Sequence, residues 1–310
     1  MLDICLPGTG GMVPLKNRWL TCLYARCGSH AVLIDCGEGT QIALSQAECR
    51  IKPIDMICIT HFHADHIAGI AGLLLSMGNA GRTEPVTICG PSNLIDILRA
   101  LLVIAPALPF DIMVTEVSGE TDQFLSAGDM MIHPFPVKHM IPCLGYTISV
   151  PRMGKFDPQR ARELDIPVRG WKMLQKNEPI QIGDRLYTPD MVMGPPRKGI
   201  KVLYSTDTRP VPEISENGKD SDLMILEGIY GDNEKIDKAR EWGHMTMPEA
   251  AHLGLAAQPG ELWLTHYSPS MPDPAPYIDD VRRIFPRTEA GFDGRRKTII
   301  FSDENSYAAR

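Results

Sequence analysis

Four side chains of the kinds that bind metal ions lie within six residues in His61-Phe62-His63-Ala64-Asp65-His66. Residues 57–60 before them are apolar or β-branched and predict a strand, so the run falls on the loop that follows that strand. His61 and His63, two positions apart, can point toward one ion, while Asp65 and His66 can reach a second. Imidazole and carboxylate ligands suit Zn²⁺. The alternative, an accidental polar loop, is disfavoured by this density of ligands.

The composition is that of an ordinary globular protein of 310 residues, a length that permits one large domain or two smaller ones. No apolar segment approaches the roughly 20 residues that a membrane span needs. The N-terminus shows no secretory signal, so we expect a cytoplasmic protein without a membrane partner. The net charge of −7 argues against indiscriminate nucleic-acid binding but leaves room for a local basic surface.

The eight cysteines are scattered and form no Cys-x-x-Cys pair. Several lie in apolar runs, such as Cys58 and Cys89. Because free cysteine packs like a small apolar residue, they are interpreted as buried thiols and not as a disulfide framework or a zinc finger.

Apolar patterning predicts alternating strands and helices in both halves of the chain. The predicted strands are Trp19–Tyr24, Ala31–Ile34, Met56–Thr60, Tyr146–Val150, Val202–Ser205, Leu223–Leu226, Leu262–Thr265 and Thr298–Phe301. The predicted helices are Gly39–Glu48, Ile67–Met77, Ser92–Ala105, Pro248–Ala257 and Ala275–Ile284. Pro91-Ser92-Asn93 offers cap chemistry for the third helix, and Thr246 is the expected N-cap of the fourth.

The His-x-His-x-Asp-His run is the hallmark of the metallo-β-lactamase superfamily, which the chain resembles. The superfamily's remaining ligands, each at a strand end, correspond to His139, Asp207 and His266. The resemblance implies an α/β fold, a four-layer αβ/βα sandwich, with two metal ions. One ion would be held by His61, His63 and His139 and the other by Asp65, His66 and His266, with Asp207 bridging them. Two Zn²⁺ ions are expected, although Mn²⁺ and Fe²⁺ also accept such ligands.

Further sequence blocks resemble the ribonuclease Z family of tRNA 3′-processing endonucleases. They are Gly8-Thr9-Gly10-Gly11 followed by Pro14, Asp35-Cys36-Gly37-Glu38-Gly39-Thr40-Gln41, His139-Met140-Ile141-Pro142-Cys143-Leu144-Gly145-Tyr146, Asp207-Thr208-Arg209 and Leu264-Thr265-His266. The glycine-rich block lacks the spacing of a nucleotide-binding loop, and a tight turn near the active-site mouth is expected there. Asp35 could orient a ligand histidine or simply belong to a turn.

The resemblance implies a zinc-dependent endoribonuclease that removes the 3′ trailer from precursor tRNA. Cleavage would leave a 3′-hydroxyl on the tRNA and a 5′-phosphate on the trailer. Two partly matching blocks, Leu226-Glu227-Gly228 and Gly243-His244-Met245-Thr246, retain a glutamate and a histidine of the family. His244 is therefore expected to act as general acid with the support of Glu227, and Asp65 to orient the attacking water.

A basic segment interrupts the second half of the chain. The family carries a flexible inserted arm that grips tRNA, and we place the arm at residues 152–200 within a single domain spanning residues 1–310. Residues 152–201 contain eleven basic and six acidic residues, a local charge of +5 in a chain of −7. Arg169, Lys172 and Lys176 are the candidate contacts with the tRNA backbone. The family's usual Gly-Pro pair is replaced by Gly170-Trp171.

Two other functions remain open on the sequence. A phosphodiesterase of the same fold that acts on cyclic nucleotides or other small phosphodiesters is the nearest alternative, and the basic arm disfavours it. A non-catalytic RNA-binding protein with a decayed site would not be expected to keep seven ligand positions. The family resemblance also implies a homodimer in which the arm of one subunit serves the site of the other.

Overall fold

The computed structural model describes residues 1–105, 107–118 and 123–302. The chain divides into two compact units. The core unit comprises Met1–Ser149 and Lys201–Ile300, and the arm unit comprises Val150–Ile200 together with residues 301–302. Within the described ranges, no helix is both long and apolar enough to cross a membrane.

The first sheet of the core unit has seven strands in the order β16-β1-β2-β3-β4-β5-β6. They are β1 (Leu2–Gly8), β2 (Cys22–Cys27), β3 (His30–Ile34), β4 (Ile54–Cys58), β5 (Val86–Gly90), β6 (Ile112–Glu116) and β16 (Arg295–Ile299). Strands β3 to β6 run parallel, so the carboxyl ends of β3 and β4, which precede Asp35 and His61, meet at one edge.

The second sheet also has seven strands, in the order β15-β14-β13-β12-β9-β8-β7. They are β7 (Leu125–Ala127), β8 (Met130–Val137), β9 (Cys143–Arg152), β12 (Arg197–Ser205), β13 (Leu223–Glu227), β14 (Leu262–Thr265) and β15 (Thr288–Ala290). Strands β12 to β15 are parallel, so the residues that follow β12, β13 and β14 gather at one edge.

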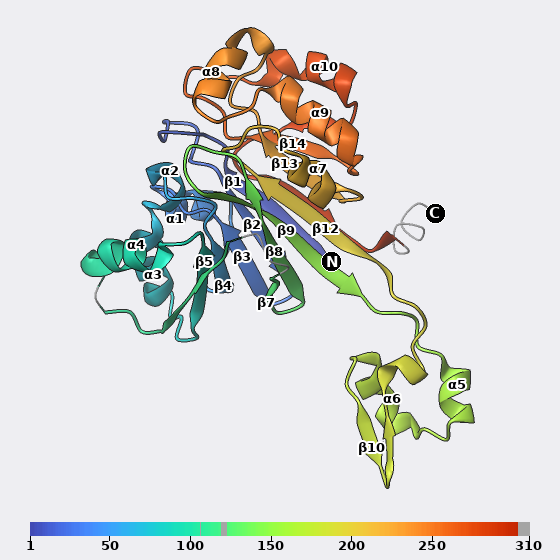
Figure 1. Cartoon of the computed structure of the whole chain (residues 1–310). Helices are drawn as coiled ribbons and strands as arrows, with labels where there is room; N and C mark the ends of the chain where they lie inside the picture. Colours follow the sequence, from blue (N-terminus) through green and yellow to red (C-terminus); the bar gives the residue numbers. More distant parts are fainter. Residues whose placement is uncertain (106, 119–122, 303–310) are drawn as a thin grey trace. The chain divides into compact units, whose positions relative to one another are not determined.

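Helices cover the outer faces of both sheets (Figure 1). The helices on the first sheet are α1 (Thr40–Gln46), α2 (Ala64–Ile67), α3 (Ile70–Asn79) and α4 (Leu94–Leu101), followed by the 3₁₀ turn Leu102–Ile104. Those of the second half are α7 (Pro212–Gly218), α8 (Ile236–Glu241), α9 (Met247–Ala257) and α10 (Ala275–Ile284). The two sheets contact each other: the Tyr146 hydroxyl on β9 donates to the carbonyl of Ile59, which follows β4, over 2.7 Å.

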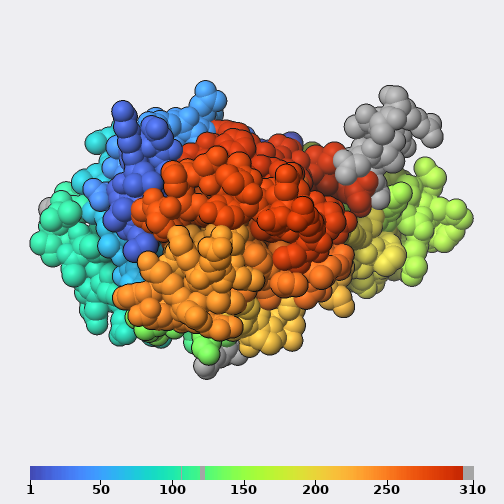
Figure 2. All heavy atoms as spheres, turned by 90° about the horizontal axis from the view of Figure 1, so that it is seen from above, coloured from blue at the N-terminus to red at the C-terminus, as the bar shows by residue number. Residues whose placement is uncertain are grey.

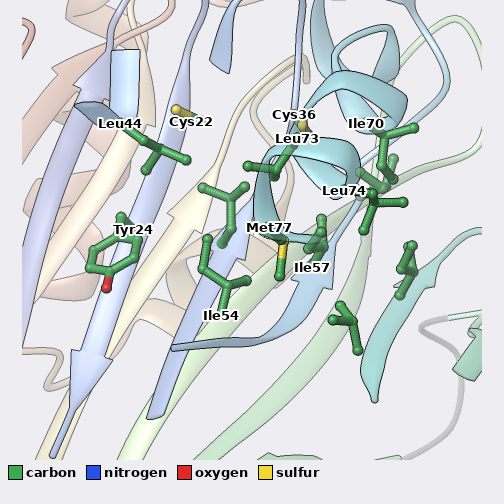
Figure 3. Close-up of a cluster of buried hydrophobic side chains, with 14 of the residues drawn as sticks. Cys22, Tyr24, Cys36, Leu44, Ile54, Ile57, Ile70, Leu73, Leu74 and Met77 are labelled. Atoms are coloured by element: carbon green, nitrogen blue, oxygen red, sulfur yellow. The ribbon is translucent and has the colours of Figure 1, made fainter. Parts of the chain in front are cut away.

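Helix α3 shows why this arrangement is stable. Ile70, Leu73, Leu74 and Met77 recur at the spacing of one helix face and are almost fully buried. Figure 3 shows them against the strand that carries Ile57. Burying each such side chain contributes about 1.5–3 kcal/mol, so this face anchors α3 and, through it, the loop that carries the histidine run.

The predicted strand Leu262–Thr265 and helix Ala275–Ile284 are confirmed at the same bounds. Thr246 caps α9 as expected, and Glu249 completes a capping box. All eight cysteines are free and seven are buried, which confirms their interpretation as thiols. The bounds predicted for two strands, 19–24 and 298–301, are shifted by about three residues from the observed strands β2 and β16.

Two helix predictions were wrong in detail. The segment predicted as one helix over 67–77 breaks between α2 and α3, where the amide of Gly69 donates to Cys36 O over 2.9 Å. A Cβ at Gly69 would lie 1.9 Å from Gly37 O, so only glycine permits this approach. Asn93, at the N-cap of α4, has a φ of 77° and makes no side-chain cap hydrogen bond, contrary to the expected capping.

The arm unit has a small core of its own. It contains α5 (Pro158–Glu163), α6 (Val168–Gln175), the hairpin β10 (Ile180–Ile182) and β11 (Arg185–Tyr187), and the 3₁₀ turn Pro189–Met191. Its buried residues are Ala161, Ile166, Leu174, Ile180, Tyr187 and Val192. Gly170 packs against Ile180, and Trp171 Nε1 donates to Ile166 O over 2.9 Å, so the pair that replaces Gly-Pro serves this core. Sequence patterning predicted none of these elements.

The N-terminal loop of the core unit closes against the C-terminal half. Arg18 donates through Nη1 to Met271 O over 2.8 Å, and Gly11 N donates to Tyr267 O over 3.0 Å. Figure 2 shows this blue segment beside the orange and red ones. The contact brings the glycine-rich block to the strand ends where the predicted ligands lie.

Candidate metal centre

The seven residues predicted as metal ligands converge in the core unit. They come from four places: His61, His63, Asp65 and His66 after β4 and in α2, His139 between β8 and β9, Asp207 after β12, and His266 after β14. The parallel strands bring their carboxyl ends together, so residues up to 205 positions apart in sequence meet in one cluster.

The first group of ligand atoms belongs to three histidines. His61 Nε2 lies 3.0 Å from His63 Nδ1, which lies 3.3 Å from His139 Nε2. Two nitrogens bound to one tetrahedral zinc ion, each about 2.0–2.1 Å from it, are roughly 3.3 Å apart. The three nitrogens therefore have the spacing of ligands around one ion.

The second group joins Asp65, His66 and His266. Asp65 Oδ2 lies 3.5 Å from His66 Nε2 and 3.6 Å from His266 Nε2. Asp65 Oδ2 also accepts a hydrogen bond from Met12 N over 2.6 Å, which fixes the carboxylate against the glycine-rich loop. A Cβ at Gly11 would lie 2.7 Å from the His266 ring, so the predicted tight turn borders the centre and requires glycine there.

Asp207 lies between the two groups. Its Oδ2 is 2.8 Å from His66 Nε2 and 3.7 Å from His61 Nε2, and its Oδ1 is 3.0 Å from His266 Nε2. One carboxylate thus faces ligands of both groups. The backbone of Asp207 (φ 53°) and of His266 (φ 56°) is left-handed, a conformation that costs free energy in non-glycine residues and concentrates at functional sites.

Unsatisfied buried atoms test whether these residues fit a metal. His66 Nε2, His266 Nε2 and Asp207 Oδ1 are buried and make no hydrogen bond of acceptable angle among the described residues, although both nitrogens lie close to Asp207 oxygens. A buried polar atom without a partner costs about 1–3 kcal/mol, so such atoms are few in a native protein. A bound cation would satisfy all three, and the histidine and aspartate donors suit zinc.

Neighbouring groups orient the ligands. Asp35, fully buried, lies with Oδ2 2.8 Å from His66 Nδ1, and its Oδ1 accepts from Thr60 N over 2.9 Å. His139 Nδ1 lies 3.0 Å from Gly243 O. Each contact leaves the Nε2 atom of the histidine facing the centre. Of the two interpretations of Asp35, the structure supports the one in which it orients a ligand histidine.

The electrostatics of the three-histidine group also favour metal binding. Burial lowers the pKa of His61, His63 and His139, which keeps these imidazoles neutral and available as ligands. Burial disfavours the Asp207 carboxylate, but His266 and His66 outweigh this effect and hold the pKa of Asp207 well below its usual range. Asp207, which faces both groups, is therefore an anion.

His244 and Glu227 form a pair beside the centre. His244 Nδ1 lies 3.0 Å from Glu227 Oε2, and Thr208 N donates to Glu227 Oε1 over 2.6 Å. Arg209 donates to His244 O and pairs with Glu249, which holds the backbone of this segment. Burial alone would lower the pKa of His244, but the charge and hydrogen bond of Glu227 outweigh it and raise that pKa.

The centre opens into a cavity of about 360 Å³. His63, Asp65, His139, Asp207, His244 and His266 line it, together with Met12, Met140 and Trp242. Sequence analysis did not single out Met12 or Trp242. No periodicity or ligand chemistry marks them, and only the fold brings them to the centre.

The other predicted residues lie elsewhere. Arg169, Lys172 and Lys176 are exposed in the arm unit, on or at the end of α6, and are not part of the metal centre. His30, His133 and His252 belong to none of the ligand clusters found among the described residues.

Comparisons with known proteins agree with this architecture. Residues 2–104 match the family described as Anti-Pycsar protein Apyc1, and residues 181–267 match the Beta-lactamase superfamily domain. The crystal structure of human tRNase Z, short form, has a TM-score of 0.69 at 22% identity and covers 96% of this chain and 100% of that one. The predicted metallo-β-lactamase fold is thereby confirmed.

Full-length relatives define the family more narrowly. The ribonuclease Z of Lachnospira eligens is 51% identical over 304 residues, which is 98% of this chain and 100% of the relative. The ribonuclease Z of Agathobacter rectalis is 50% identical with the same coverage. Because half of the residues are identical over whole chains, and because the histidine and aspartate cluster is present, the chain belongs to the ribonuclease Z family.

Proposed function

We propose that this protein is a zinc-dependent endoribonuclease that removes the 3′ trailer from precursor tRNA. The products are a tRNA with a 3′-hydroxyl and a trailer with a 5′-phosphate. The observation that carries the proposal is the pair of ligand groups that meet at Asp207. It is made in a chain that is 51% identical to a ribonuclease Z over 98% of its length.

The ligand groups would hold two ions. His61, His63 and His139 would bind one, Asp65, His66 and His266 the other, and Asp207 both. Two bound ions supply a water of lowered pKa and stabilise the charge that develops on the attacking and leaving oxygens. Zn²⁺ is the proposed metal, and Mn²⁺ and Fe²⁺ suit the same donors.

Three side chains have proposed roles in the reaction. Asp65, fixed by Met12 N, orients the attacking water. As the bond between phosphorus and O3′ breaks, His244 gives a proton to O3′ of the tRNA. Glu227 contacts Nδ1 of His244, which leaves the opposite ring nitrogen, Nε2, free to face the substrate. Glu227 is a positioning residue for this step.

The arm unit is proposed to hold the body of the tRNA. Arg169, Lys172 and Lys176 recur at the spacing of one helix face, and all three are exposed. Such a face can contact successive phosphates of a nucleic-acid backbone without reading its sequence. The acidic remainder of the chain would limit promiscuous binding.

The assembly and location belong to the same proposal. We infer a homodimer, which places the arm of one subunit near the metal centre of the other, and a cytoplasmic protein. The mass in solution, measured by light scattering, tests the first inference: a monomer would contradict it.

The experiment that tests the function is incubation with a 3′-extended tRNA precursor. The zinc-loaded protein should release the trailer, Asp207→Asn should not, and His252→Ala, on the exposed surface of α9, should act like the original protein. If the protein hydrolyses bis-p-nitrophenyl phosphate but leaves the precursor intact, the proposal is wrong and a phosphodiesterase for small esters takes its place.

A further inference from the structure

A second cavity, of about 370 Å³, adjoins the metal centre in the core unit. Met12, Trp242 and His244 line both this cavity and the cavity of the metal centre, so the two are neighbours across shared walls. Its volume lies within the range of roughly 300–1,000 Å³ that small-molecule sites occupy. None of the seven predicted metal ligands lines this cavity.

The walls of this cavity suit a flat aromatic group. Tyr230 is 5% exposed and forms a buried wall, while Trp242 is 53% exposed and Met12 is 59% exposed. Lys238 also lines the cavity, with Nζ 5.8 Å from the centre of the Tyr230 ring. Aromatic rings on which bases stack, beside a positive charge for the backbone, are the usual elements of a site for single-stranded nucleic acid.

Trp242 is tied to the same turn as the proposed general acid. Trp242 is the C-cap of helix α8, and its amide donates to Lys238 O over 3.2 Å, while His244 N donates to Ala239 O over 2.8 Å. Between them Gly243 has a φ of 72°, and its carbonyl lies 3.0 Å from His139 Nδ1. The turn therefore fixes Trp242 relative to both His244 and the first ligand group.

The direction of cleavage identifies the nucleotide that would enter. The proposed reaction expels O3′ of the nucleotide on the 5′ side of the scissile phosphate, here called the upstream nucleotide. His244 gives its proton to that oxygen, so the ribose of the upstream nucleotide lies against His244. His244 also lines the second cavity, so that cavity adjoins the expected position of the upstream ribose.

The geometry points to a base-binding site: the base of the upstream nucleotide stacks on Trp242 in the cavity bounded by Tyr230 and Met12. Trp242 is thus a substrate-binding residue, and Lys238 neutralises a phosphate of the same strand. This inference rests on the proposed function, since it takes the substrate and the direction of cleavage from it.

The test combines a variant with a modified substrate. Precursor tRNA is prepared with a normal upstream nucleotide, with an abasic one, and with an abasic nucleotide directly downstream of the scissile phosphate. The protein and its variant Trp242→Ala are assayed with all three. Removing one stacked base costs about 5- to 150-fold in this kind of contact, and the upstream abasic substrate should lower kcat/KM of the original protein by that factor.

On the normal precursor, Trp242→Ala should lower kcat/KM by a similar factor. On the upstream abasic precursor the same variant should lower kcat/KM only slightly, because the stacked base is already absent. Trp242→Phe, which keeps an aromatic face, should recover most of the loss. The downstream abasic precursor should change kcat/KM of the original protein and of Trp242→Ala by the same factor. Phe124→Ala, which removes a similarly exposed aromatic ring that lines neither cavity, is the matched control and should act like the original protein.

The inference is overturned if the original protein cleaves the upstream abasic precursor as fast as the normal one, a comparison that needs no variant. It is also overturned if the losses from Trp242→Ala and from the abasic substitution multiply, as they would for a variant that is only misfolded. If the original protein cleaves no precursor at all, the proposed function fails first.

Discussion

His244 Nδ1 lies 3.0 Å from Oε2 of the fully buried Glu227. Because Thr208 N holds the other carboxylate oxygen, Glu227 has a fixed position from which it orients the imidazole. A histidine held at one ring nitrogen by a buried carboxylate can transfer a proton through the other.

This relationship predicts a dependence on the leaving group. His244→Ala should lower kcat on precursor tRNA by about 10²–10⁴-fold, because the departing O3′ needs a proton. The loss should be much smaller on bis-p-nitrophenyl phosphate, whose leaving group departs without one. Glu227→Gln should show the same pattern with a smaller loss, and His252→Ala should show neither. Equal losses on both substrates would contradict the assignment of His244 as general acid.

The ligand geometry predicts the metal content of single variants. Elemental analysis of the purified protein should find two zinc ions per chain. His139→Ala removes one nitrogen of the three-histidine group and should lower the content toward one ion, because the group around Asp65, His66 and His266 stays intact. His30→Ala, at a histidine outside the ligand clusters, should keep both ions. Full metal content in His139→Ala would contradict the assigned ligand sets.

The exposed basic face of α6 predicts a defect that is confined to tRNA. Replacement of Arg169, Lys172 and Lys176 by alanine should raise KM for precursor tRNA while kcat on bis-p-nitrophenyl phosphate stays unchanged. Since each phosphate contact releases about one counterion, the salt dependence of KM should also become shallower. Lys52→Ala, an exposed lysine of the core unit, is the control. An equal defect on the small ester would contradict the role of the arm.

How far the site could be predicted depended on local chemistry. The run from His61 to His66 could be recognised because four side chains of ligand type lie within six residues, and strand β14 because its apolar pattern is uninterrupted. The break at Gly69 could not, since its cause is the approach of Gly37, a tertiary contact that leaves no trace in helical periodicity. The core of the arm unit was missed because its apolar residues are spread among charged ones.

Trp242 shows a further limit of sequence analysis. It precedes the expected general acid by two residues, yet its position on the cavity wall depends on the end of α8 and on the left-handed Gly243. Neither property can be predicted from a pattern of apolar residues. Residues that carry ligand chemistry were found from the sequence, whereas those that shape the surrounding space needed the fold.

An ion pair between the two sheets predicts a pH dependence of stability. Glu261, directly before β14, pairs with Lys297 on β16 and accepts a hydrogen bond from Trp263 Nε1 over 2.5 Å. Burial disfavours the carboxylate, but Lys297 outweighs it and lowers the pKa of Glu261 below its ordinary value of 4.5. Its contribution to stability is therefore present above pH 4.5 and is lost as the pH falls through the lower folded-state pKa.

Glu261→Gln should lower the free energy of unfolding at pH 7 by about 1 kcal/mol, a value discounted for the partial exposure of the pair. The difference from the original protein should shrink as the pH falls well below 4.5, as measured by urea unfolding at several pH values. Glu216→Gln, on the exposed surface of α7, should have no such effect. A difference that stays constant with pH would contradict the assigned ion pair.

The chemical ends of the cleavage products test the central claim most directly. A 3′-extended precursor tRNA is incubated with the zinc-loaded protein, and the ends of both products are determined. The account predicts a single internal cut that leaves a 3′-hydroxyl on the tRNA and a 5′-phosphate on an intact trailer. Stepwise removal of nucleotides from the 3′ end, or a tRNA that ends in a 3′-phosphate, would contradict it.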